Sequence, residues 1–105
     1  MTYRVEFSTA AEADLERLFD FVLKRELESA SGDLDLPERA LQAIKDGVAF
    51  LRTSPFVCRK VGSSPFVREV VNSFGRAGYV ALYEIVDERN VIIGAVRHQR
   101  EDDDH

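Results

Sequence analysis

The segment YVALYEIVDERNVIIGAVRH, residues 79–98, contains two stretches of β-branched and aromatic residues separated by the short polar sequence DERN. Valine, isoleucine and tyrosine are enriched in strands, whereas aspartate and asparagine favour tight turns. The segment therefore predicts an antiparallel hairpin with strands over residues 79–86 and 90–98.

A third strand is expected upstream, because FVREVV at residues 66–71 has the same composition and is followed by the glycine-containing loop NSFGRAG. These three segments predict an antiparallel meander. Near the N-terminus, YRVEFS at residues 3–8 alternates apolar and polar side chains, as a strand with one buried face does. Four strands are expected in total.

Two helices are predicted between the first strand and the meander. Thr9 and Glu12 match a T-x-x-E capping box, which marks the start of a helix. The polar stretch ESASGDLDLP, residues 28–37, predicts the loop between the helices, with Pro37 in the first turn of the second. That helix is expected to end at TSPF, residues 53–56. The apolar faces at helical spacing comprise Ala11, Leu15, Leu18, Phe19 and Val22, then Ala40, Leu41, Ile44, Val48 and Leu51.

This order of elements, strand, helix, helix and three strands, predicts an α+β fold in one domain spanning residues 1–105. The helical hairpin is expected to pack on one face of a four-stranded, mainly antiparallel, twisted sheet. The opposite face should then be partly open to solvent. Residues 101–105, EDDDH, form an acidic tail.

Charge is distributed unevenly along the chain, which has 105 residues and a net charge of −5. Residues 1–54 are acidic, residues 55–100 carry an excess of Lys and Arg, and the tail is acidic again. The N-terminal sequence lacks the pattern of a secretory signal, and no apolar run is long enough to span a bilayer. A cytoplasmic protein without a membrane partner is therefore expected, and the single cysteine, Cys58, is compatible with a reducing compartment.

Motifs for cofactors and metals are missing: there is no glycine-rich phosphate loop, nucleophile elbow or Cys/His ligand spacing. We therefore expect no cofactor and no metal site. What remains is a set of basic groups on or beside the meander, namely Arg59, Lys60, Arg68, Arg76, Arg89, Arg97, His98 and Arg100.

The last strand decides which of these groups meet. If it runs regularly through residue 100, His98 and Arg100 share one surface with Ile92 and Val96, and Arg97 faces the other way. Arg68, among apolar neighbours, must reach solvent, pair with Glu69 or Glu84, or bind an external anion. A structural ion pair for Arg68, a partly buried His98 and solvated surface charge for Arg97 and Arg100 remain alternatives.

The whole pattern resembles a known family. The start YRVEFSTAAEADL, the stretch FLRTSPF, the arginine of FVREV, the strand YVALYEIVD and the closing VIIGAVRHQRED come in the order typical of the RelE/ParE superfamily of type II toxins. These toxins are encoded beside small antitoxins in bacterial and plasmid stability modules. The resemblance covers roughly residues 3–102 and implies the same βααβββ fold.

The resemblance implies one of two activities. Relatives similar to RelE cleave mRNA on the ribosome, and in that branch Arg68 and His98 match a phosphate-stabilising and a proton-transferring group. Relatives similar to ParE block DNA gyrase without catalysis. The net charge of −5 and a last tyrosine at Tyr83 favour the ParE-like branch, because binding to ribosomal RNA favours a strongly basic protein.

A cognate antitoxin is the expected partner in either branch, in a groove bordered by the first helix and the sheet. The target, DNA gyrase or alternatively the ribosome and its mRNA, is expected to meet Arg59, Lys60, Arg97 and Arg100. A non-toxic binding module of the same fold is the third interpretation. The acidic tail is expected to screen the neighbouring arginines from anions.

Overall fold

A computed structural model describes residues 2–74 and 77–98 of the chain. It has two long helices, one turn of 3-10 helix and five strands. In chain order the elements are β1 Arg4–Phe7, α1 Thr9–Leu27, α2 Leu36–Val48, η1 Ala49–Arg52, β2 Arg59–Lys60, β3 Val67–Phe74, β4 Ala77–Ile85 and β5 Asn90–His98.

The strands form one mixed sheet in the order β1-β5-β4-β3-β2. β1 runs parallel to β5, and the other neighbours are antiparallel. The predicted α+β architecture is confirmed, but the sheet has five strands instead of four. The additional strand, β2, is only two residues long and pairs Arg59 with Glu69 and Lys60 with Arg68. Two charged residues carry no periodic signal from which a strand could be predicted.

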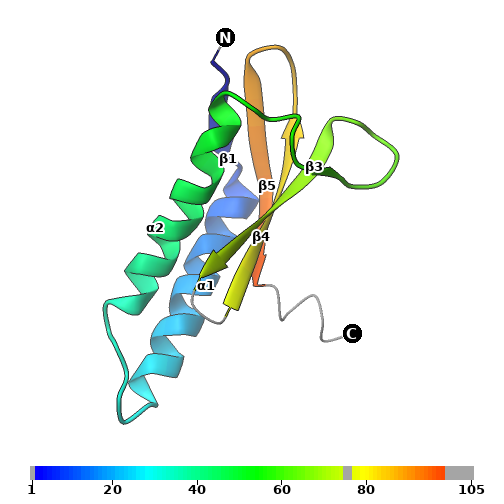
Figure 1. The fold of residues 1–105 in the computed structure, drawn as a ribbon. Coiled ribbons are helices and arrows are strands. Elements are labelled where there is room, and N and C mark those ends of the chain that lie inside the picture. Colours follow the sequence, from blue (N-terminus) through cyan, green and yellow to red (C-terminus); the bar gives the residue numbers. More distant parts are fainter. Residues whose placement is uncertain (1, 75–76, 99–105) are drawn as a thin grey trace.

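Both helices cover the same face of the sheet, as Figure 1 shows, and the tip of the helical hairpin projects beyond the ends of the strands. The core lies between these two layers. A parallel pairing of β1 and β5 requires the chain to cross over the sheet, and the helical hairpin makes that crossing. Buried core residues from the two layers include Leu15, Leu18, Ile44, Val48, Val70, Ala81, Tyr83, Val91, Ile93 and Val96.

A bulge at Gly94 interrupts the alternation of side chains along β5. Leu82 pairs with Ala95 and Tyr83 with Ile93, so Gly94 has no partner on β4. Residues on the two sides of a bulge follow opposite parity. Ile92 is therefore exposed while His98 is buried, and the expected regular strand with both on one surface is wrong.

The first helix begins one residue earlier than the predicted capping box. Ser8 is the N-cap, and its Oγ accepts a hydrogen bond from the Ala11 amide at 3.0 Å. The Ser8 amide also donates to the Ile93 carbonyl at 2.9 Å, which joins the helix start to β5. Further along α1, Asp14 Oδ2 accepts a hydrogen bond from the Val96 amide at 2.9 Å. These bonds fix α1 against the strand beyond the point where β1 ends.

A buried tyrosine ties the sheet to the loop that follows η1. Tyr83 is 2% exposed, and its hydroxyl donates to the Pro55 carbonyl at 2.7 Å. Burial raises the pKa of the Tyr83 phenol well above its usual range, and hydrogen bonding to Cys58 adds to this rise. The folded protein therefore favours the neutral phenol.

Replacing Tyr83 with phenylalanine should lower the free energy of unfolding at pH 7 by about 1–2 kcal/mol, because the Pro55 carbonyl loses its buried partner. The pH dependence should change too. A tyrosine with a raised pKa in the fold stabilises it below pH ~10 and loses that contribution as the unfolded chain ionises above it. Denaturant unfolding between pH 9 and 11 should show a decline that is shallower in Tyr83→Phe. Equal slopes in both proteins would contradict the assignment.

Candidate functional site

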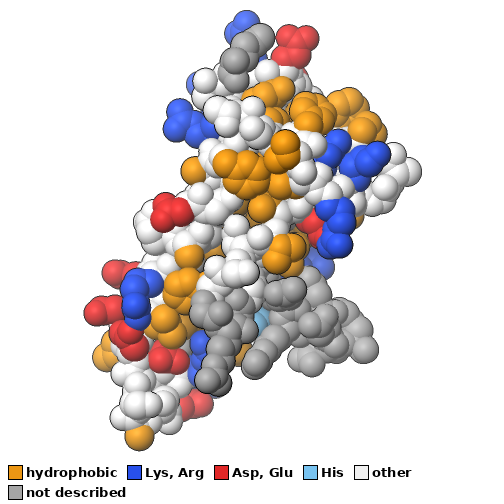
Figure 2. All heavy atoms as spheres, viewed as in Figure 1, with side chains coloured by type: hydrophobic (Ala, Val, Ile, Leu, Met, Phe, Trp, Pro, Cys, Tyr) orange, Lys and Arg blue, Asp and Glu red, His pale blue; other side chains and the backbone are white. Residues whose placement is uncertain are grey.

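The surface opposite the helices is the part of the sheet that the helical hairpin leaves uncovered. We call it the outer face and define it by Arg59, Glu69, Val71, Leu82, Ile92 and Arg97, whose side chains alternate with those of the core. In the view of Figure 2, Lys and Arg side chains gather beside the loop that carries β2, whereas Asp and Glu side chains gather over the helices. The predicted contrast between an acidic helical half and a more basic second half is visible in space.

Two of the predicted target-binding residues lie on the outer face. Arg59, Glu69, Leu82 and Ala95 are paired in one row across four strands, and Val71, Val80 and Arg97 form the adjacent row. Three strand spacings separate β2 from β5, which amounts to about 14 Å. The apolar side chains of Val71, Val80 and Leu82 lie between Arg59 and Arg97, and we call them the apolar strip. Arg59 is itself paired with Glu69, with 76% of its side chain exposed.

The other two predicted target-binding residues are not placed with them. Lys60 pairs in register with Arg68, so it alternates to the side of the sheet opposite Arg59. Arg100 lies outside the described residues, and so does the acidic tail.

Arg68 is a tether for the loop before β3. Its Nε donates to the Pro65 carbonyl at 2.8 Å, and its Nη1 donates to the carbonyls of Phe56 and Cys58 at 2.8 and 2.7 Å. The guanidinium also lies 5.3 Å from the centre of the Phe56 ring. Among the described residues no carboxylate is paired with Arg68: Glu69 is bonded to Arg59 instead. Three of the five donors of this arginine are committed to backbone carbonyls.

His98 is a core residue at the end of β5. It is 4% exposed, and its ring lies 5.3 Å from that of Tyr79 in an edge-on arrangement and 6.1 Å from that of Phe21. An aromatic environment of this kind stabilises an imidazole mainly by packing. The interpretation of His98 as a partly buried structural histidine describes this placement well.

The structure does not bring Arg68 and His98 together. Arg68 on β3 pairs with Tyr83 of β4, whereas His98 on β5 pairs with Tyr79 of β4. The two registers differ by four residues along β4, or about 13 Å. A general acid or base must lie within hydrogen-bonding reach of the group it serves, directly or through one water. This pair alone could not flank a single phosphate.

A hollow of about 440 Å³ lies on α1 between the two helices, lined in part by Leu15, Phe19 and Leu41 with Glu16 and Lys45 at its rim. The groove expected for the antitoxin was placed between α1 and the sheet. There, α1 packs closely on β5 through Asp14 and Phe21. The location of the antitoxin contact stays a prediction.

Across residues 2–74 and 77–98, no three His, Cys, Asp or Glu side chains cluster as metal ligands would. No helix in the same part of the chain is long and apolar enough to cross a bilayer.

Comparison with solved structures places this fold beside a toxin–antitoxin protein. A chain of a structure described as a chromosomal ParDE TA system from P. aeruginosa has a TM-score of 0.68, with 18% identity over 90% of this chain and 94% of that one. No curated protein sequence matches. Residues 5–103 match the model of a family described as the ParE toxin of the type II toxin-antitoxin system, parDE. The chain belongs to this ParE toxin family.

The apolar part of the outer face was not singled out from the sequence. Its members Val71, Leu82 and Ile92 look like ordinary strand residues, and because of the Gly94 bulge Ile92 lies on the opposite side of β5 from Val96 and His98. The alternation in VREVV was a usable signal, because Arg68 and Val70 take one side and Val71 takes the other.

Substituting Arg68 with lysine should separate tethering from charge. Lysine keeps the charge but cannot reach three carbonyls at once, so the free energy of unfolding should fall by about 1–3 kcal/mol. The loop over residues 53–66 should also be cut faster in limited proteolysis. Arg59→Lys is the matched control, because its exposed ion pair predicts a loss of at most about 1 kcal/mol. Equal effects of the two substitutions would argue against the tether.

Proposed function

We propose that this protein is the toxin of a type II toxin–antitoxin pair, that it inhibits DNA gyrase by binding, and that a cognate antitoxin neutralises it in the cytoplasm. The observation that carries the proposal is the ParE toxin family match over residues 5–103. The structural neighbour described as a ParDE system supports the same assignment at the level of the fold.

Inhibition by binding is favoured over mRNA cleavage by the placement of two side chains. The donors of Arg68 are directed at loop carbonyls, and His98 is buried against aromatic rings. Neither is positioned beside the other to act on one phosphate. A net charge of −5 also opposes tight association with ribosomal RNA.

The outer face is the surface that we assign to the target. The outer face combines an apolar strip, which a partner can bury, with the positive charges of Arg59 and Arg97 on either side of it. Many protein–protein interfaces have this composition. Val71 is 49% exposed there, and burying it against a partner would contribute hydrophobic free energy. Binding of this kind requires no cofactor.

Purified protein should inhibit the supercoiling activity of DNA gyrase in vitro, and expression without an antitoxin should arrest growth. The double substitution Val71→Glu with Arg97→Glu places charge in the apolar strip and reverses the cation beside it, so inhibition should weaken by about tenfold or more. Lys24→Glu, a charge reversal at an exposed position on α1, is the control and should inhibit as wild type does.

Three results would contradict the proposal. The first is full supercoiling activity at a large excess of folded protein. The second is mRNA cleavage in growth-arrested cells, which would indicate the ribosome-dependent nuclease. The third is normal growth with confirmed soluble protein, which would indicate a non-toxic binding module.

A further inference from the structure

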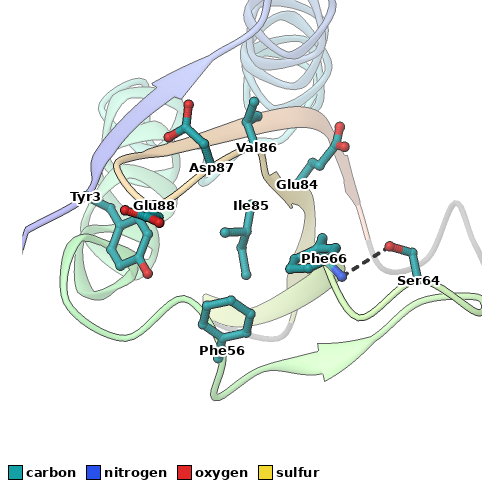
Figure 3. Close-up of a pocket in the computed structure, with 9 residues that line it drawn as sticks. All are labelled: Tyr3, Phe56, Ser64, Phe66, Glu84, Ile85, Val86, Asp87 and Glu88. Atoms are coloured by element: carbon teal, nitrogen blue, oxygen red, sulfur yellow. Dashed lines mark hydrogen bonds between the residues drawn. The ribbon is translucent and has the colours of Figure 1, made fainter.

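A groove of about 470 Å³ lies where β4 ends, apart from the hollow between the helices. It adjoins the outer face at Glu84, which is paired with Ile92. Figure 3 shows its walls. They come from three separate parts of the chain: the residue before β1, the tethered loop before β3, and the end of β4 with the turn that follows it. The lining residues are Tyr3, Phe56, Ser64, Phe66, Glu84, Ile85, Val86, Asp87 and Glu88.

The floor of the groove is apolar and aromatic. Ile85 points toward Phe56 between the flanking rings of Tyr3 and Phe66 (Figure 3), and it is 5% exposed. Phe56 and Phe66 are 46% and 49% exposed, with ring centres 6.3 Å apart in an edge-on arrangement. Two half-exposed phenylalanines held together in this way present apolar surface that gains free energy when a partner covers it.

Hydrogen bonds hold the segments that carry Phe56 and Phe66 and leave the groove open. The Ile85 amide donates to the Phe66 carbonyl at 2.8 Å, and the Phe66 amide donates to Ser64 Oγ at 3.2 Å. Phe56 is held by Arg68, which donates to its carbonyl and lies over its ring. The groove is therefore largely formed before any partner arrives, which limits the entropy lost on binding.

All the charged side chains in the lining are acidic: Glu84, Asp87 and Glu88. Glu84 lies on the side of Phe66 and Glu88 on the side of Tyr3 (Figure 3). Asp87 accepts hydrogen bonds from the Arg89 amide and the Asn90 side chain at 2.8 and 2.9 Å, which keep it ionised. Aromatic rings flanked by carboxylates attract a cation and repel phosphate groups.

We propose that this groove binds a protein segment that presents an arginine or lysine beside an apolar side chain. The apolar side chain covers Ile85 between the rings. The cation lies beside Phe66 within reach of Glu84 or beside Tyr3 within reach of Glu88 (Figure 3), because the guanidinium of Arg68 already lies over the Phe56 ring. The geometry and charge of the groove carry this inference, and it holds whether or not the protein inhibits gyrase.

The test is an NMR titration of the isotopically labelled protein with the peptide acetyl-Leu-Arg-Leu-amide. Amide signals of residues 84–88 and of Phe66 should shift in a saturable manner. A peptide with citrulline in place of arginine has the same shape without the charge, and it should bind about fivefold more weakly. Equal binding of the two peptides, or shifts confined to other surfaces, would overturn the proposal.

Two sets of variants locate the site. Glu84→Gln with Glu88→Gln should reduce the preference for arginine over citrulline, and Phe66→Ala should weaken both peptides. Glu12→Gln with Glu16→Gln removes the same charge from α1 and should leave the preference intact. If the two pairs reduce the preference equally, general electrostatic attraction explains the binding, and if only the α1 pair reduces it, the peptide binds on α1; either result overturns the proposal. Circular dichroism of each variant confirms that the fold is retained.

Discussion

The parallel pairing of β1 with β5 is the constraint on which the architecture depends. Parallel neighbours need a long crossover connection, and here α1 and α2 supply it on one side of the sheet. β1 ends at Phe7, so the edge of β5 beyond Ile93 would be unpaired without another partner. Ser8 and Asp14, both at the start of the helical crossover, bond that edge instead. The same arrangement keeps both helices off the outer face (Figure 1).

Most of the fold was predictable because its signals are local. β5 spans residues 90–98 as its β-branched composition predicts, and α1 and α2 follow the apolar periodicity of the sequence. The strand β2 was missed, since its two residues have only their partners in β3 to define them. The bulge at Gly94 was missed as well, because it depends on bonds from residues more than 80 positions away, in α1 and its N-cap.

The candidate site, too, was predictable only where its signals are local. Sequence identified the basic residues of the second half but could not tell which of them share a surface. Arg59 and Arg97 do so because β3 and β4 lie between them in register, whereas Arg68 is drawn into a loop. Arg68 donates to three backbone carbonyls, and no local sequence pattern specifies where these carbonyls lie. Residue types therefore indicated which functional groups the chain contains, and tertiary contacts determine which of these groups share a surface.

The pairing of β1 with β5 also has a consequence in time. Arg4 pairs with Asn90, so the first strand has no partner until the last strand has been synthesised. At about 5–20 residues per second, translation of the intervening chain takes roughly 4 to 17 s. Such non-local contacts fold late, because the entropy of closing the chain must be overcome first. A nascent chain therefore lacks the complete pairing of β1 with β5 until residue 93 has left the ribosome, and it lacks the complete outer face until Arg97 has done so.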